Sequence, residues 1–256
     1  MGDDTVHANI TQPFYIGAHE VTQRQYEAVM GNTPSYFSEH GDGRDFVTGT
    51  DTSQFPVDSV SWLDAIEFCN KLSEYQHLSL CYRRANDSAD VALSDGDGFR
   101  LPTEAEWEWA CRGYSLYAFN TEGRLSGVDA NINGKYVFVA DGEQSALDPI
   151  GPKTDPNGAY LERTTTVGSY PPNRFGLFDM HGNVQEWCSD WYGTEYYKVF
   201  QNNPVDDPHG PSKGEYRVIR GGSWKSQPRY AMSRTRTSNP PDIRNKTVGF
   251  RIARNR

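Results

Sequence analysis

The chain has 256 residues, 24 glycines, 15 prolines, 13% aromatic residues and a formal net charge of −9 at pH 7. This composition predicts one loop-rich domain over residues 1–256 that is held by aromatic clusters, rather than a helical bundle. The acidic balance argues against a nonspecific nucleic-acid binder, and the lack of an apolar run of about eighteen residues argues against a membrane span.

The first predicted elements are a strand and a short helix. Residues 14–21 have the composition of a strand. Thr22 is followed three residues later by Gln25, which is the spacing of a capping box, and the helix that begins there should end at Gly31. Residues 32–54 are polar and are expected to form a loop.

Two more helices have the same start signal. Ser61 precedes Asp64, and apolar residues follow at helical spacing. Thr103 precedes Glu106 in the same way, and Gly113 should end this third helix. Its first two turns contain three glutamates, which we expect to form a solvated face that the helix dipole stabilises. They are Glu104, Glu106 and Glu108.

The second half of the chain has weaker periodicity. Residues 114–163 predict a long irregular segment, of a kind that is usually functional or ion-stabilised when ordered. Strands are expected at 164–170, within 217–224 and at 247–253. Residues 176–191 concentrate carboxylates, an amide, a histidine and two tryptophans. We expect the rest of the chain to be organised around this central stretch.

Positive charge gathers in one polar segment, Trp224–Lys246. Arginine and aromatic side chains anchor many interfaces, so this segment is typical of a recognition surface. The residues expected to contact a ligand are Trp224, Ser226, Arg229, Tyr230, Arg234, Arg236 and Asn239. The other interpretation is a solvated or internally paired arginine face.

The four cysteines form no CxxC pair, so a zinc knuckle or a thioredoxin-like site is not expected. Buried thiols are the favoured interpretation. That pattern favours a cytoplasmic location, whereas secretion after removal of a signal peptide stays open. The cysteines are Cys69, Cys81, Cys111 and Cys188.

Ordered blocks along nearly the whole chain resemble the formylglycine-generating enzyme family, also called the sulfatase-modifying-factor domain. The blocks are Glu20–Thr22, Pro56-Val57, Val60–Trp62, Arg100–Glu108, Pro172–Leu177, Gly182–Trp187, Arg220–Trp224 and Gly249–Arg251. The resemblance implies an α+β, C-type-lectin-like fold with short strands, about three short helices and much irregular structure.

The resemblance also implies structural calcium beside the central stretch. Ca²⁺ prefers carboxylate and carbonyl oxygens, and this stretch offers both. The ligands would be the side chains of Asp179 and Glu186 and the carbonyls of Gly182 and Val184. A second site would use Asn131 and the Ile132 carbonyl, with groups near Asp155–Tyr160, where the spacing departs from the family pattern.

The chain departs from the family at its catalytic positions. The family's aerobic enzymes bind copper through two cysteines and oxidise a substrate cysteine to formylglycine. Here those positions are Ser226 and Ala231, and neither side chain replaces a thiolate ligand of Cu(I). Copper-type formylglycine generation is therefore not expected.

Iron is not expected either. The family's iron-dependent relatives need a histidine-rich triad, and the six histidines of this chain show no HxxxH or HxE spacing. They are His7, His19, His40, His77, His181 and His209. A facial triad assembled from distant positions stays open.

Two functions follow from these observations. The first is a binding module that presents Trp224–Lys246 to a peptide or protein ligand; a pseudo-enzyme that binds a sulfatase or a formylglycine-generating enzyme is one form of it. The alternative is a divergent metal- and oxygen-dependent oxidoreductase acting on a peptide or peptide-like substrate, with His181, Ser226 and Tyr230 as candidate catalytic residues. A metal or cofactor bound in the groove expected beside His181 would favour the oxidoreductase over the binding module.

Overall fold

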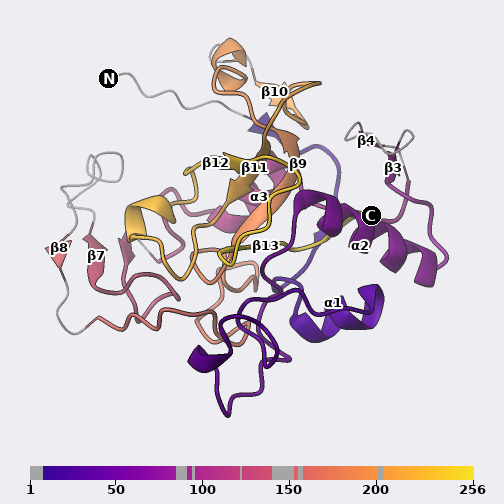
Figure 1. The fold of residues 1–256 in the computed structure, drawn as a ribbon. Coiled ribbons are helices and arrows are strands. Elements are labelled where there is room, and N and C mark those ends of the chain that lie inside the picture. Colours follow the sequence, from indigo (N-terminus) through magenta and orange to yellow (C-terminus); the bar gives the residue numbers. More distant parts are fainter. Residues whose placement is uncertain are drawn as a thin grey trace.

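The computed structural model describes residues 8–84, 91–93, 96–121, 123–139, 153–154, 158–200 and 204–256. Within these residues the chain forms three short α-helices and many short strands, joined by long irregular segments (Figure 1). The helices are α1 (Gln23–Met30), α2 (Trp62–Tyr75) and α3 (Glu104–Arg112). The α+β architecture expected from the sequence is confirmed.

Each helix begins where its sequence signal predicted. The side chains of Thr22, Ser61 and Thr103 accept a hydrogen bond from the third helical residue, whose own side chain accepts from the cap backbone. Gly31 and Gly113 end α1 and α3 with φ angles of 75° and 53°. Glycine adopts this left-handed conformation without a steric cost, so these two ends are set locally.

The main sheet has four strands in the order β12-β11-β9-β13. β11 pairs antiparallel with both of its neighbours, and β13 runs parallel to β9. Their bounds are β9 (Gln185–Trp191), β11 (Arg217–Arg220), β12 (Thr237–Asn239) and β13 (Val248–Gly249). This sheet contains the second half of the central stretch as β9, and its strand β12 lies within the Trp224–Lys246 segment.

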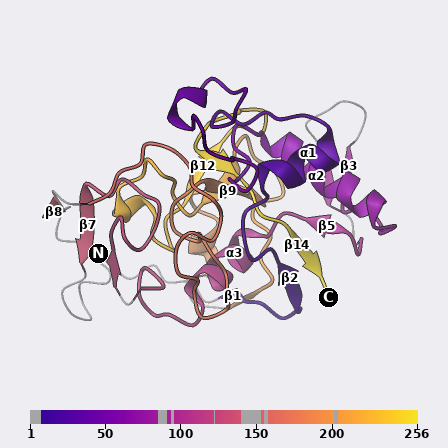
Figure 2. The ribbon, with the colours of Figure 1, turned by 90° about the horizontal axis from the view of Figure 1, so that it is seen from below.

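A second sheet joins the two ends of the chain. β14 (Ala253–Asn255) pairs antiparallel with β2 (Phe14–Ile16) on one side and with β5 (Phe99–Arg100) on the other. Figure 2 shows β2, β14 and β5 together near the C-terminus.

The remaining strands and 3₁₀ helices are short. β1 pairs with β10, β3 with β4, and β7 with both β6 and β8. Their bounds are β1 (Ala8–Asn9), β3 (Tyr82–Arg84), β4 (Val91–Leu93), β6 (Arg124–Leu125), β7 (Tyr136–Val139), β8 (Lys153–Thr154), β10 (Val205–Asp206), η1 (Arg44–Phe46), η2 (Tyr197–Phe200) and η3 (Pro228–Tyr230).

Several strands are shorter than predicted. The strand expected at 14–21 ends at Ile16, and that expected at 247–253 divides into β13 and β14. No strand forms at 164–170, because the Thr165 amide donates to the Asn183 side chain rather than to a neighbouring strand. Side chains therefore replace ladder partners for parts of this backbone.

β9 is covered on both faces. On one face Trp187 packs in a cluster with α1 and α2, and its indole Nε1 donates to the carbonyl of Val60. On the other face Cys188 packs against Trp107 of α3. The four cysteines are buried and free, as predicted. No helix in the described part of the chain is long and apolar enough to cross a membrane.

Candidate functional site

A fully buried ion pair joins Glu186 of the central stretch to Arg251. Both oxygens of Glu186 accept hydrogen bonds from the guanidinium of Arg251, at 2.6 and 2.7 Å, and the Trp107 indole Nε1 donates to the same carboxylate at 2.7 Å. Both charged side chains are fully buried. Arg251 also donates to the carbonyls of Gly17 and Phe178. The guanidinium thus ties the central stretch to the N-terminal part of the chain.

Two further carboxyl groups lie near this pair. Asp179 accepts a hydrogen bond from the Gly168 amide at 2.6 Å. Glu20 is buried, and neither of its oxygens makes a hydrogen bond of normal geometry within the described residues. Burial, and then the charge of Asp179, raise the pKa of Glu20 well above its usual range, and burial raises the pKa of Asp179 to about 6. The three buried carboxyl groups of Glu186, Asp179 and Glu20 therefore lie near a single guanidinium, that of Arg251.

The calcium prediction concerns these same residues. The donor chemistry fits a hard cation, since carboxyl oxygens are in excess and those of Glu20 lack hydrogen-bond donors. Glu186 fits least, because Arg251 already binds both of its oxygens. No group of three or more histidine, cysteine, aspartate or glutamate side chains suited to a metal occurs among the described residues. Calcium at Asp179 and Glu186 stays a prediction.

The residues of the second expected calcium site pin the central loop. The Asn131 carbonyl accepts from the Asn183 amide at 2.8 Å, and its side chain donates to the Asn183 side chain at 3.1 Å. A Cβ on Gly182 would lie 2.4 Å from the Asn131 oxygen, so only glycine fits there. Ile132 is buried in a hydrophobic cluster. Residues 155–157 lie outside the described residues, and this site too stays a prediction.

His181 holds the loop through both ring nitrogens. Its Nε2 accepts from the Asn120 amide at 3.2 Å, which leaves the proton on Nδ1 to be donated to the Ala231 carbonyl at 2.7 Å. The ring is 5% exposed, and burial lowers its pKa to about 4. A neutral ring with both nitrogens occupied suits a positioning role, rather than the acid or base role for which the sequence made it a candidate.

The glutamates of α3 are not a solvated face, so that expectation was wrong. Glu104 forms a bidentate pair with Arg236 at 2.6 and 2.7 Å. Glu106 forms one with Arg100 at the same two distances. Glu108 pairs with Arg220 and Arg112. Arg236 and Arg220, more than a hundred residues away, and the nearby Arg100 turn this helix face inward, because burying one charge requires its counter-charge.

The same network fixes the Trp224–Lys246 segment from inside. Arg220, which is fully buried, donates to the carbonyls of Ser233 and Thr235 at 2.7 and 2.5 Å. His181 binds the Ala231 carbonyl. These contacts hold the carbonyls of residues 231, 233 and 235, so the irregular stretch between η3 and β12 has a defined path without being part of a sheet.

The structure divides the predicted contact residues into two groups. Arg229 and Tyr230 are exposed, and Ser226, Arg234 and Asn239 are half-buried. Trp224 and Arg236 face inward: Trp224 is 5% exposed and packs edge-on against Phe37, and Arg236 is paired with Glu104. These two side chains support the surface instead of forming it.

The positions of the family's cysteines differ in exposure. Ser226 is half-buried in a tight turn, where its Oγ accepts from the Ser223 amide at 3.0 Å. Ala231 is fully buried and lies against Gly222. Two side chains without thiols thus occupy these places, one at the surface and one beneath it.

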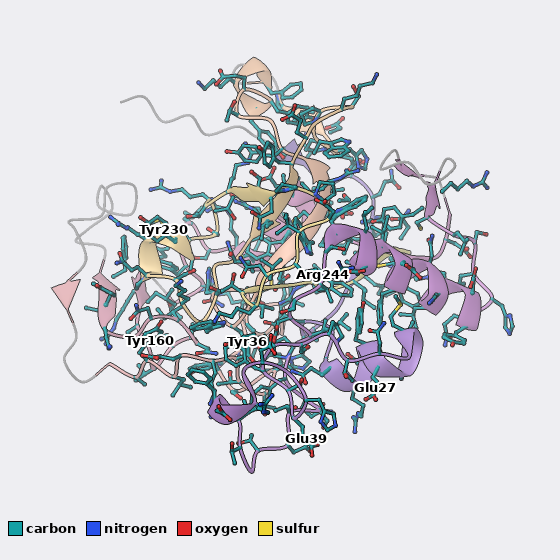
Figure 3. The ribbon with its side chains drawn as sticks, in the orientation of Figure 1. Glu27, Tyr36, Glu39, Tyr160, Tyr230 and Arg244 are labelled. Atoms are coloured by element: carbon teal, nitrogen blue, oxygen red, sulfur yellow. The ribbon has the colours of Figure 1, made fainter. Side chains whose placement is uncertain are left out.

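Sequence reasoning missed the aromatic residues that other loops bring to this face. Tyr36 and Tyr160 are half-buried neighbours of the cluster formed by Phe37, Val47, Phe55 and Trp224. Figure 3 shows them on the same face as Tyr230. The feature of the sequence that could have identified these two tyrosines is an aromatic residue within an otherwise polar stretch without periodicity.

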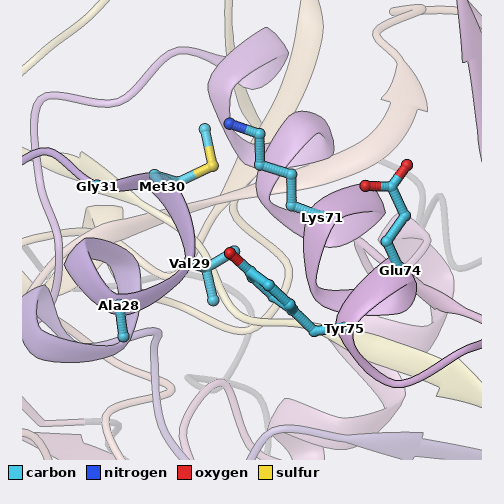
Figure 4. A pocket seen from close by; sticks show the side chains of 7 residues that line it. All are labelled: Ala28, Val29, Met30, Gly31, Lys71, Glu74 and Tyr75. Atoms are coloured by element: carbon cyan, nitrogen blue, oxygen red, sulfur yellow. The ribbon is translucent and has the colours of Figure 1, made fainter.

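A small surface pocket lies elsewhere, between the C-terminal ends of α1 and α2 (Figure 4). Its volume is about 410 Å³, and its lining includes Met30, Lys71, Glu74 and Tyr75. None of the predicted site residues lines it.

Comparison with known proteins supports the family resemblance. Residues 3–256 match the family model of the sulfatase-modifying factor enzyme 1-like domain. The chain is 40% identical over 164 residues to the formylglycine-generating enzyme of Streptomyces coelicolor, which covers 61% of this chain and 46% of that protein.

Two relatives align over almost the whole chain. Treponema denticola variable protein 1 has a solved structure that covers 95% of this chain and 84% of its own, with a TM-score of 0.73 and 31% identity. The serine/threonine-protein kinase pkn1 of Chlamydia pneumoniae is 31% identical over 265 residues, covering 98% of this chain but 34% of the kinase. The chain thus spans about a third of the length of that curated relative. It belongs to the sulfatase-modifying factor enzyme 1-like, or formylglycine-generating enzyme, family and has its C-type-lectin-like α+β fold.

Proposed function

We propose that this domain is a binding module that presents the Trp224–Lys246 segment to a peptide or protein ligand. One observation carries the proposal: buried side chains hold the main chain of this irregular segment from inside, through Arg220 and His181, while Arg229 and Tyr230 face solvent. Ordering a loop before association reduces the entropy lost on binding. A rigid loop that exposes arginine and tyrosine suits recognition.

The alternative is a divergent oxidoreductase acting on a peptide-like substrate. The residues at the two cysteine positions give it no thiolate, and the nitrogens of His181 are both occupied. We therefore expect no oxygen uptake with a Cys-x-Pro-x-Arg peptide and no stoichiometric copper or iron in the purified protein. Uptake, or either metal, would favour the alternative.

A phage-displayed library of random peptides tests the binding proposal. We expect selected peptides to bind the wild-type protein, and to bind the Arg229→Ala/Tyr230→Ala variant roughly 30-fold more weakly, which corresponds to about 2 kcal/mol at a binding hot spot. Glu27→Ala is the matched control, because Glu27 is an exposed residue on α1. Circular dichroism would check that each variant is folded.

The proposal fails if no peptide is enriched, or if the selected peptides bind the double variant as tightly as wild type. Either result would indicate that this segment is not the recognition surface.

A further inference from the structure

Lysines lie over aromatic rings along the face that contains Trp224. The Nζ atom of Lys246 is 4.2 Å from the ring centroid of Tyr36 and 6.0 Å from that of Trp224. Trp224 stacks loosely with Tyr160 at 6.5 Å, and Nζ of Lys135 is 5.3 Å from the Tyr160 centroid. We call Tyr36, Lys246, Trp224, Tyr160 and Lys135 the cation–aromatic strip.

Three separate parts of the chain build this strip. Tyr36 comes from the loop after α1, Lys135 and Tyr160 from the long irregular segment, and the other two from Trp224–Lys246. Tyr36 and Tyr160 both pack against the cluster that contains Trp224, and Figure 3 labels both. The members of the strip other than the buried Trp224 therefore widen the proposed recognition surface beyond a single loop.

The two lysines of the strip differ from the neighbouring arginines in their ion pairing within the described residues. Within the described residues neither Lys246 nor Lys135 forms an ion pair, whereas Arg236 pairs with Glu104 and Arg244 pairs with Asp64. The chain has 34 acidic and 25 basic residues, so carboxylates are not scarce. A cation over a ring keeps its full charge and can still bind an anion.

A carboxyl group close to the strip, that of Asp58, already accepts several hydrogen bonds. Asp58 is buried behind Tyr36, and it accepts hydrogen bonds from the amides of Tyr36 and Phe37 and from the Ser59 hydroxyl. Its charge acts on Lys246, but no ion pair forms between them. Asp58 thereby fixes the loop that bears Tyr36 and leaves the outer side of Lys246 available.

We propose that the ligand of this face is an acidic peptide segment of a partner protein. Its carboxylates would bind Lys246 and Lys135, and its apolar groups would lie on Tyr36 and Tyr160. A short segment fits better than a long polyanion. Salt screens charges more than about 10 Å apart, so a short segment interacts mainly with the two lysines, whereas a long polyanion would also be repelled by the rest of a protein with a net charge of −9. This inference rests on the proposed function and narrows it.

The library selection described above also tests the acidic ligand. We expect enrichment of Asp and Glu, and weaker binding when those residues are replaced by Asn and Gln or when salt is raised. Lys246→Gln and Lys135→Gln should each weaken binding by about 1.5- to 5-fold, the range for exposed charge pairs. Lys71→Gln is the matched control, since Lys71 is a partly exposed cation on α2, outside the proposed surface, and is already paired with Glu67.

The outcomes separate the two proposals. Peptides that need Arg229 and Tyr230 but are not acidic, or are insensitive to both lysine substitutions, would overturn the acidic ligand and leave the binding module in place. Peptides unaffected by any of these variants would overturn both. Acidic peptides whose binding is weakened by the Lys246 and Lys135 variants and not by Lys71→Gln would support both.

Discussion

Removing one charge of the buried Glu186–Arg251 pair tests whether this pair is the internal support of the central loop. The two side chains share two hydrogen bonds and have no exposure to solvent. Glu186→Gln removes the negative charge with little change of shape. Arg251→Met removes the positive charge, and it also leaves the carbonyls of Gly17 and Phe178 without these donors.

The structure sets the expected magnitude. Each single variant leaves an uncompensated buried charge or unpaired buried groups, so each should lower the free energy of unfolding by about 3–5 kcal/mol. For a chain of this size about 2–4 °C is lost per kcal/mol, which gives a decrease in Tm of roughly 6–20 °C. The double variant leaves neither charge. Its cost should be smaller than the sum of the single costs by about 1–3 kcal/mol.

Urea unfolding followed by tryptophan fluorescence measures these differences. The series should be run with calcium and with EDTA, because Glu186 is also a predicted calcium ligand. Arg244→Gln serves as the control: it breaks an exposed pair with Asp64 and should cost less than about 1 kcal/mol.

Two results would refute the reasoning. Additive costs would mean that Glu186 and Arg251 do not act as each other's counter-charge. A calcium-dependent stabilisation of the wild type that disappears in Glu186→Gln would mean that Glu186 binds the ion, rather than being satisfied by Arg251.

Three other predictions concern buried groups. Burial raises the pKa of Asp190 to about 7, so the folded state holds more protons than the unfolded state between about pH 4 and 7. Asp190 therefore lowers the free energy of unfolding by up to about 1.4 kcal/mol for each unit of rising pH, and Asp190→Asn should remove that slope in urea titrations. Burial lowers the pKa of His181 to about 4, so its contribution rises with pH between about 4 and 6.5, and His181→Gln should change the pH dependence in the opposite sense; unchanged slopes would contradict either assignment. Gly222→Ala should cost about 1–3 kcal/mol in the same assay, because φ is +74° and the new Cβ would lie 2.7 Å from that of Ala231; a neutral effect would argue against this turn.

The candidate site shows where sequence patterns stop being sufficient. Arg229 and Tyr230 were expected at the surface and lie there. Arg236 was expected beside them and instead pairs with Glu104. The sequence could not show this, because an exposed and an internally paired arginine look alike in a segment without hydrophobic periodicity. Tyr36 and Tyr160 could not be assigned to the same face, since only the folded chain brings their loops together.

The sequence by itself determined where the three helices begin and to which family the chain belongs. Caps such as Thr22 with Gln25 and stops such as Gly31 act within one helical turn, so a short stretch of sequence contains all the information they need. Tertiary structure alone decided the direction of the α3 glutamates, the lengths of the strands and the partner of Glu186. These depend on pairs such as Glu108 with Arg220, 112 residues apart, and Glu186 with Arg251, 65 apart. The stability of a buried charge depends on whether such a distant counter-charge arrives, which no local pattern records.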